Sequence, residues 1–137
     1  MPEGTISGEG EGLVAGEVIS ALFPEHVTGE HEQQGLRPAV VVGIPGSLGE
    51  PRFEVLAVVP MTTDRSQGWS RRSPALYPRF ACGTAKLRSP SICLLDQVRA
   101  IGAERVRGYR GTLTADQHHP IHAGLRRMMS HAEIDAG

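Results

Sequence analysis

The chain has 137 residues, of which 39% are hydrophobic and 21% charged, and its formal net charge is −1. This length supports one compact domain with one core and excludes separate catalytic and binding domains, and the composition excludes a wholly disordered chain. No apolar run is long enough for a membrane span, and the N-terminus lacks the basic and apolar regions of a signal peptide. We therefore expect a cytoplasmic protein that does not contact a membrane.

Charge is unevenly distributed along the chain. Residues 1–17 contain four glutamates and no basic residue, whereas residues 64–79, here called the basic loop, contain four arginines and one aspartate. Such a local excess of positive charge makes the basic loop a candidate for phosphate contacts. The two cysteines, Cys82 and Cys93, provide neither a disulfide framework nor a four-ligand zinc site, and we expect two small buried thiols.

The order of predicted elements begins with a loose arm. Residues 1–12 are rich in Gly and Glu, so we assign them to a flexible arm, residues 13–129 to one domain, and residues 130–137 to a flexible tail. A first strand is expected within residues 13–23, which end before Pro24. A polar loop follows, and a buried strand begins at Pro38 and continues through the apolar run 39–42.

Turns and short apolar runs alternate through the middle of the chain. Residues 43–49 resemble a phosphate-binding loop only superficially, because no Lys-Ser/Thr ending follows, and we interpret them as a hairpin loop. Further strands are predicted at 53–59, 79–84 and 91–98. Short strands separated by turns predict a small, mainly β barrel.

The last predicted element is a helix. Thr114 and Gln117 have the spacing of a capping box, and an apolar stripe follows at Ile121, Leu125, Met128 and Met129. Pro120 would cost roughly 3 kcal/mol inside a helix. Two starts therefore remain open: one at the capping box, and one near His119 with Pro120 in the first turn.

Four sequence blocks, taken in order, resemble one family. They are Gly16-Glu-Val, Gly29-Glu-His-Glu-Gln-Gln-Gly-Leu-Arg-Pro-Ala-Val-Val-Val-Gly43, Val58-Val-Pro-Met-Thr-Thr63 and Leu95-Asp-Gln-Val-Arg-Ala-Ile101. The chain is thereby similar to the MazF/PemK toxins, including the Kid-like members. The resemblance implies a Src-homology-3-like barrel of the MazF/PemK/CcdB type with a C-terminal helix. It also implies a homodimer that cleaves RNA through a 2′,3′-cyclic phosphate and is neutralised by a MazE/PemI-like antitoxin.

Cleavage of RNA by protein groups alone requires a base, an acid and positive charge for the phosphorane. Arg37 can supply the charge, because its planar fork matches two phosphate oxygens and the following proline favours extended backbone. Thr62 stands at the family's threonine position and can hydrogen-bond the scissile phosphate. Thr63 can share that role, although two threonines at a strand end are also typical of β-propensity alone.

The base and the acid remain open. His31 lies in the longest block and has a suitable unperturbed pKa, but a solvated loop histidine would have the same sequence. Glu32 is a candidate base or a partner of Arg37, and the two roles compete. Asp96 matches the aspartate that the resemblance implies as base. The arginine of Kid-like members two residues before it is Leu94 here, so we prefer a centre formed by Arg37 and Thr62.

RNA contacts are expected outside this centre as well. Trp69 and Tyr77 flank Arg71 and Arg72, an arrangement that can stack unpaired bases while the arginines hold the backbone. Trp69 anchoring the loop to the barrel is an equally open interpretation. The remaining predicted RNA contacts are Gln33, Gln34, Arg65 and Gln97.

Neither a metal nor a cofactor is expected. His118, His119 and His122 lie near one helix face, but Pro120 disturbs the spacing a metal site would need, and a polar helix face is the favoured interpretation. The function predicted from the sequence is a metal-independent endoribonuclease toxin acting on single-stranded RNA. The alternative is a non-catalytic protein of the same fold, either a CcdB-like gyrase poison or a binder of RNA or antitoxin, which Leu94 favours.

Overall fold

The structure is a computed structural model that describes residues 12–24 and 35–130. Within this part, seven strands form one antiparallel sheet: β1 (Glu17–Phe23), β2 (Gly35–Gly43), β3 (Val55–Thr63), β4 (Arg79–Phe80), β5 (Ser91–Cys93), β6 (Arg99–Gly102) and β7 (Val106–Thr112). Two α-helices, α1 (Gly68–Arg72) and α2 (Ala115–Met128), and four short 3₁₀ turns, η1 (Pro45–Ser47), η2 (Thr84–Lys86), η3 (Leu95–Gln97) and η4 (Ala103–Arg105), complete it.

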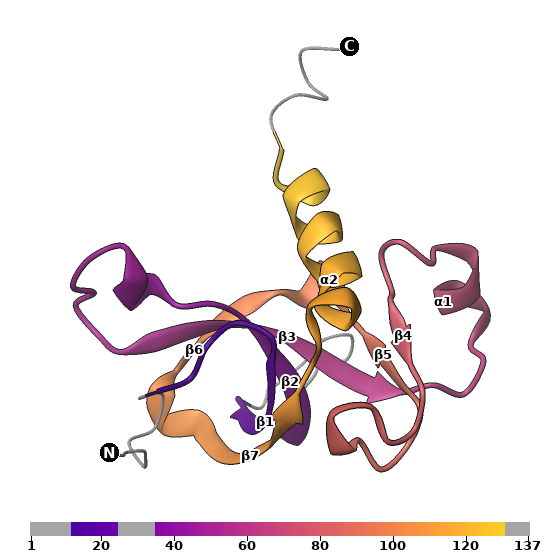
Figure 1. The fold of residues 1–137 in the computed structure, drawn as a ribbon, viewed down its shortest axis with the longest axis horizontal. Helices are drawn as coiled ribbons and strands as arrows, with labels where there is room; N and C mark the ends of the chain where they lie inside the picture. Colours follow the sequence, from indigo (N-terminus) through magenta and orange to yellow (C-terminus); the bar gives the residue numbers. More distant parts are fainter. Residues whose placement is uncertain (1–11, 25–34, 131–137) are drawn as a thin grey trace.

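The sheet curls because β3 pairs with different strands along its length. The strand order is β4-β5-β3-β2-β1-β7, and β6 also pairs with β3. Residues 55–58 of β3 pair with β6, and residues 61–63 pair with β5. Figure 1 shows the strands curled around one another, with α1 carried on a loop at one side and α2 leaving the end of β7. The predicted mainly β barrel with a C-terminal helix is confirmed.

The two ends of the curled sheet come together where η2, which follows the end strand β4, packs on the end strand β7. A Cβ placed on Gly111 of β7 would lie 2.6 Å from the carbonyl oxygen of Ala85 in η2. Only glycine permits this approach of two backbones. The segment that follows η2 is therefore held against β7, and this contact positions one wall of the site described below.

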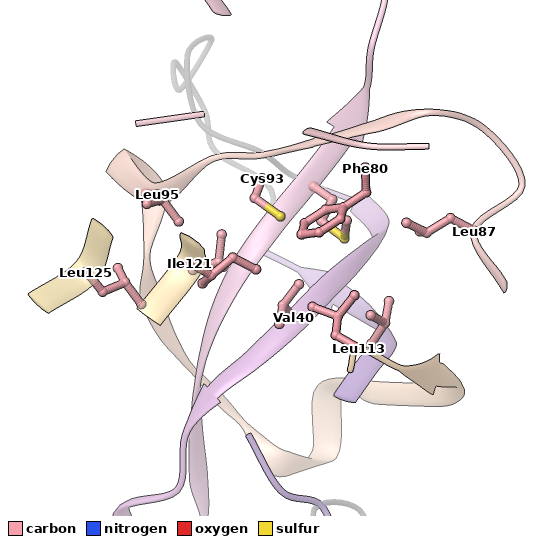
Figure 2. Packing of buried hydrophobic residues seen from close by; sticks show 11 residues of the cluster. Val40, Phe80, Leu87, Cys93, Leu95, Leu113, Ile121 and Leu125 are labelled. Carbon is pink, nitrogen blue, oxygen red and sulfur yellow. The ribbon is translucent and has the colours of Figure 1, made fainter. Parts of the chain in front are cut away.

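Two apolar clusters fill the interior, one on each side of the β1–β2 ribbon. Val18 and Val40 belong to the first cluster, and Ile19 and Ala39 to the second, as the period-2 alternation of strands requires. In Figure 2, Leu95, Ile121 and Leu125 gather on one side of Cys93 and Val40, and Phe80, Leu87 and Leu113 on the other. Of the predicted buried run 39–42, residues 39–41 are fully buried and Val42 is partly buried. Strand β2 begins at Gly35, before the predicted start at Pro38.

Helix α2 docks closely on the barrel. Its N-terminus has the predicted capping box, with the Gln117 amide donating to Thr114 Oγ1 at 3.1 Å and the Thr114 amide donating to Gln117 Oε1 at 2.8 Å. The alternative start near His119 is wrong. Pro120 lies on the exposed face, where water can satisfy the carbonyl that lacks its N–H partner. The predicted apolar stripe is too long, since Met128 and Met129 are exposed.

Several predicted strand limits differ from the observed ones. The third strand begins at Val55, and Phe53 is exposed. The strand predicted at 79–84 ends at Phe80, because Gly83 adopts a φ of 94° and the chain turns into η2. The strand predicted at 91–98 ends at Cys93, because η3 follows. Strand β7 was not predicted, since its sequence VRGYRGT combines two glycines with only two hydrophobic residues.

The cysteine prediction is half correct. Both thiols are free, but only Cys93 is buried, and burial raises the pKa of its thiol above the ordinary range. Cys82 is exposed and donates to the carbonyl oxygen of Arg88 at 3.3 Å. The predicted arm and tail lie outside the described residues except for Gly12 and Ser130, so their flexibility stays a prediction.

Candidate active site

Arg37 and Thr62 lie just beyond the end of the β2–β3 ladder. The last pair of this antiparallel ladder is Ala39 with Pro60. Two residues further along their strands, Arg37 pairs with Ala21 of β1 and Thr62 pairs with Ile92 of β5. Both residues line one cavity of about 220 Å³. The two residues that the sequence suggested as a catalytic centre therefore share one cavity.

The walls of this cavity, here called the arginine cavity, come from β2, β3, β5, β7 and the loop between η2 and β5. The ten lining residues are three arginines, four residues with a hydroxyl group and three apolar residues: Arg37, Pro38, Met61, Thr62, Thr63, Leu87, Arg88, Ser89, Ser91 and Arg110. No Asp or Glu is among these ten described residues. A lining with three arginines attracts an anion of matching shape, such as a phosphate.

Thr62 also lines a second cavity of about 360 Å³ on its other side, here called the aromatic cavity. The other lining residues are polar, aromatic or apolar side chains from the basic loop and the η3 region: Gln67, Trp69, Tyr77, Leu94, Asp96 and Gln97. Thr62 is thus shared by a cationic hollow and by a hollow with aromatic and amide groups. This arrangement suits a ribonucleotide, whose phosphate and base have these two chemistries.

Asp96 lies in the aromatic cavity and does not line the arginine cavity. The hydroxyl of Tyr77 donates a hydrogen bond of 2.7 Å to Asp96 Oδ2. This bond, with burial and the negative charge of Asp96, raises the pKa of Tyr77 to about 12. The exposed carboxylate is thereby oriented from one side. The structure brings Asp96 next to Thr62 but in a different hollow from Arg37.

Trp69 contributes both to anchoring and to an open surface. Its ring meets Tyr77 edge-on, with ring centroids 4.9 Å apart, and 41% of the residue remains exposed. Trp69 therefore anchors α1 through one part of its ring system and presents another part to the aromatic cavity. Both interpretations drawn from the sequence describe part of this arrangement.

The basic loop is tied together by its own hydrogen bonds. Asp64 accepts from the Ser66 amide at 2.9 Å, and Gln67 donates to the carbonyl oxygen of Thr63 at 3.1 Å. Arg71 donates to the hydroxyl of Ser66 at 3.0 Å. Arg79 lies 3.8 Å from Asp64, so this pair offsets one positive charge of the loop. The side chains of Arg65, Arg71 and Arg72 remain exposed to solvent.

Four candidates from the sequence block that contains Arg37 lie outside the described residues: His31, Glu32, Gln33 and Gln34. Their roles as base, acid or RNA contacts stay predictions. Gln97, by contrast, lies in η3 and lines the aromatic cavity, and Thr63 lines the arginine cavity beside Thr62.

The histidines of α2 form a pair, with the His118 and His122 rings 6.2 Å apart. Burial and the charge of His122 lower the pKa of His118. The Nε2 atom of His118 is buried and has no hydrogen-bond partner among the described residues. Among residues 12–24 and 35–130, no three His, Cys, Asp or Glu side chains group as metal ligands would.

Sequence reasoning missed Arg88, Arg110 and Gln67. Arg110 lies on β7, the strand that lacked an apolar signal, and Arg88 follows a turn in which Ala85 and Lys86 adopt left-handed φ values without being glycines. Their place in the cavity results from the contact between η2 and β7, which no local pattern encodes. Gln67 could have been found, because it follows the threonine pair within the basic loop.

Comparisons with solved structures identify the fold. Solved structures resembling the chain include an endoribonuclease in complex with its cognate antitoxin from a Mycobacterial species, at 14% identity and a TM-score of 0.57, covering 85% of this chain and 92% of that one. Two MazE–MazF crystal forms from Deinococcus radiodurans match at 17% and 21% identity, with TM-scores of 0.59 and 0.58. They cover 84% and 85% of this chain, and 94% and 96% of theirs. These likenesses show the fold.

No curated protein sequence matches the chain. Within the part of the chain that the structure describes, no helix has the length and apolar character to cross a lipid bilayer.

A family model describing the PemK-like, MazF-like toxins of type II toxin–antitoxin systems matches residues 15–129. This match spans most of the 137 residues and includes every strand described above. The chain therefore belongs to the PemK/MazF toxin family of type II toxin–antitoxin systems.

Proposed function

We propose that the protein is an endoribonuclease that cleaves single-stranded RNA with its own side chains. The observation that carries the proposal is the presence of Arg37 and Thr62 in one cavity whose charged side chains are all arginines. The family match supports the same proposal, as does one similar structure, which is an endoribonuclease.

The proposed reaction is an internal transesterification. The ribose 2′-oxygen attacks phosphorus as a base removes its proton, the P–O5′ bond breaks, and an acid protonates the departing 5′-oxygen. The products are a 2′,3′-cyclic phosphate and a 5′-hydroxyl. Arg37 stabilises the charge that develops on the phosphorane, and the Thr62 hydroxyl donates to a non-bridging oxygen. A preorganised guanidinium can supply this stabilisation without a metal ion.

The proton-transfer groups are proposed on each side of this centre. His31 and Glu32 precede Arg37 by a few residues and are candidates from the β2 side. Asp96 is the candidate from the aromatic cavity, since it lines the same hollow as Thr62. The Tyr77 hydroxyl already donates to one oxygen of this carboxylate, and Asp96 does not line the cavity that holds Arg37. We therefore assign Asp96 first to substrate positioning.

RNA recognition is proposed in the aromatic cavity and along the basic loop. An unpaired base can pack against the open part of Trp69, while Asp96 and Gln97 offer an acceptor and an amide to its edge. Arg65, Arg71 and Arg72 then follow the phosphate backbone. Thr63, Gln33 and Gln34 are further proposed contacts near the scissile linkage.

The proposed partners follow the same electrostatics. A MazE/PemI-like antitoxin with a flexible acidic segment can occupy the arginine cavity and exclude RNA. The similar structures from Deinococcus radiodurans are of MazE–MazF. We further propose that the protein acts as a homodimer in the cytoplasm, where messenger RNA is its substrate.

The experiment for this proposal is a cleavage assay on a mixed RNA pool, with the products sequenced from their 5′-hydroxyl ends. The proposal requires 5′-hydroxyl and 2′,3′-cyclic phosphate ends at a recurring short motif. A second candidate function, binding without cleavage, is favoured by Leu94 in the wall of the aromatic cavity, where Kid-like members carry an arginine. RNA that is bound but never cut would select this second function.

A further inference from the structure

The proposed chemistry uses Arg37 and leaves two arginines of the same cavity without a role. Arg88 comes from the loop between η2 and β5, and Arg110 comes from β7. In the strand order, β5 and β7 lie on opposite sides of β3, β2 and β1. Arg88 and Arg110 therefore line one cavity only because the barrel closes. Their convergence on one hollow therefore needs a physical explanation.

Arg110 is held by a specific contact. Its Nε donates a hydrogen bond of 2.9 Å to the hydroxyl of Ser20 in β1. Ser20 pairs with Pro38 of β2, the residue that follows Arg37. One strand pairing thus fixes the spacing between the two arginines. The bond occupies Nε, and the two Nη groups at the end of the planar fork carry the donors that suit phosphate oxygens.

The backbone that carries Arg88 is held by its neighbours in the chain, while the residue itself is exposed. Leu87 is 3% exposed and belongs to the first apolar cluster, and the Ala85 backbone packs on Gly111, the residue after Arg110. Ala85 and Lys86 adopt φ values of 47° and 62°, a left-handed conformation that is costly for residues with a side chain. Strained backbone of this kind persists where the surrounding packing imposes it.

The described lining of the cavity is cationic. Its ten described residues include three arginines and four hydroxyl side chains, and no Asp or Glu is among them. Guanidinium and hydroxyl groups both donate hydrogen bonds, so an anion with several acceptor oxygens matches this lining. An RNA strand presents such anions at every linkage, so a cavity that takes the scissile phosphate has a second phosphate close by.

We propose that Arg88 and Arg110 form a second phosphate subsite, which binds the phosphodiester adjacent to the one held by Arg37 and Thr62. This inference rests on the proposed function for the identity of its ligand. Arg110 and Arg88 position the strand and take no part in bond breaking. Ser20 is a positioning residue for Arg110, because it orients the guanidinium without reaching the cavity lining.

The test measures binding separately from cleavage. A mixed-sequence RNA pool with 2′-fluoro riboses cannot be cleaved, because it lacks the attacking hydroxyl. Its affinity is measured at several salt concentrations for the wild-type protein, Arg88→Ala, Arg110→Ala, Arg110→Lys and Ser20→Ala. The matched control is Arg107→Ala, because Arg107 is exposed on the same strand β7 and does not line the cavity.

Arg88→Ala and Arg110→Ala should each bind about tenfold more weakly, as expected for the loss of a charge-assisted contact. The slope of log affinity against log salt should also fall by about 0.7 per lost phosphate contact. Arg110→Lys should keep most of the slope but lose part of the affinity, since an ammonium lacks the fork. Ser20→Ala should lose about threefold in affinity with an unchanged slope, because the charge remains. Arg107→Ala should match the wild type.

Cleavage of an ordinary RNA pool by the same proteins separates this inference from the proposed function. Absent cleavage together with the predicted binding pattern would reject the nuclease and support the subsite. Normal cleavage, with folded Arg88 and Arg110 variants that bind like Arg107→Ala, would overturn the subsite alone. Failure of the wild-type protein to bind the pool would overturn both. The subsite would also be overturned if inorganic phosphate displaced the bound RNA pool as well as unlabelled RNA does at the same concentration of phosphate groups. A site that spans two linkages of a strand requires two linked phosphates.

Discussion

The hydroxyl of Tyr77 and the carboxylate of Asp96 form a hydrogen bond of 2.7 Å between the segment before β4 and η3. It joins the wall of the aromatic cavity that carries Trp69 to the wall that carries Gln97. Because Tyr77 donates to a carboxylate, its protonated form is favoured in the folded protein.

This bond predicts a stability change at high pH. The pKa of Tyr77 is raised from 10.0 to about 12 in the folded state. Its contribution to stability is therefore complete below pH 10 and is lost as the pH rises from about 10 to about 12. Tyr77→Phe should lose less stability than the wild type over this interval. Urea unfolding at a series of pH values measures it, and an ultraviolet titration of the wild type minus Tyr77→Phe should show one transition near pH 12. A difference transition near pH 10 would contradict the prediction.

Barrel closure predicts a large difference between two glycines of one strand. Gly111→Ala places a Cβ 2.6 Å from the Ala85 carbonyl oxygen, whereas a Cβ on Gly108 meets nothing within 4 Å. Overpacking of this kind typically costs about 1–3 kcal/mol. Gly111→Ala should therefore lower the midpoint of chemical unfolding clearly, and Gly108→Ala should change it little. Equal midpoints for the two variants would mean that η2 does not pack on β7 as described.

Some of these features could be predicted from the sequence and others could not. Burial of most of the run 39–42 and the capping box at Thr114 could be predicted, because each depends on local pattern. The sequence motifs also singled out Arg37 and Thr62, which the structure places in one cavity, while their catalytic role stays a prediction. Strand β7 could not, since a glycine-rich strand is stabilised by pairing with β1 and by close backbone packing rather than by apolar side chains. The role of Arg110 was missed for the same reason.

The basic loop and Trp69 should affect RNA binding in different ways. Neutralising Arg71 and Arg72 together should weaken binding to the uncleavable pool across sequences and flatten its salt dependence, because fewer counterions are released. Trp69→Ala should weaken binding by roughly 1–3 kcal/mol per stacked base and leave the salt slope nearly unchanged. Affinities measured at four salt concentrations separate the effects. Wild-type affinity in both variants would remove the loop from the RNA interface.

Cleavage should survive excess chelator. The proposed centre stabilises the phosphorane with Arg37 and Thr62, so removal of divalent ions should leave the rate within about twofold, the usual effect of ionic conditions on binding. The check is the initial rate of cleavage of one RNA substrate with and without chelator. Activity that disappears and returns on addition of a divalent ion would contradict a centre made of protein groups alone.

The central claim is that Arg37 supplies the charge for bond breaking, and single-turnover cleavage tests it most directly. Arg37→Ala should lower the rate constant by at least about 100-fold at saturating enzyme, the loss typical of one transition-state donor. Its unfolding midpoint should stay close to that of the wild type, because Arg37 is exposed at a strand end. Arg107→Ala serves as the control for charge alone and should cleave normally. A folded Arg37→Ala protein that cleaves at the wild-type rate, with the same cyclic-phosphate and 5′-hydroxyl ends, would contradict the account.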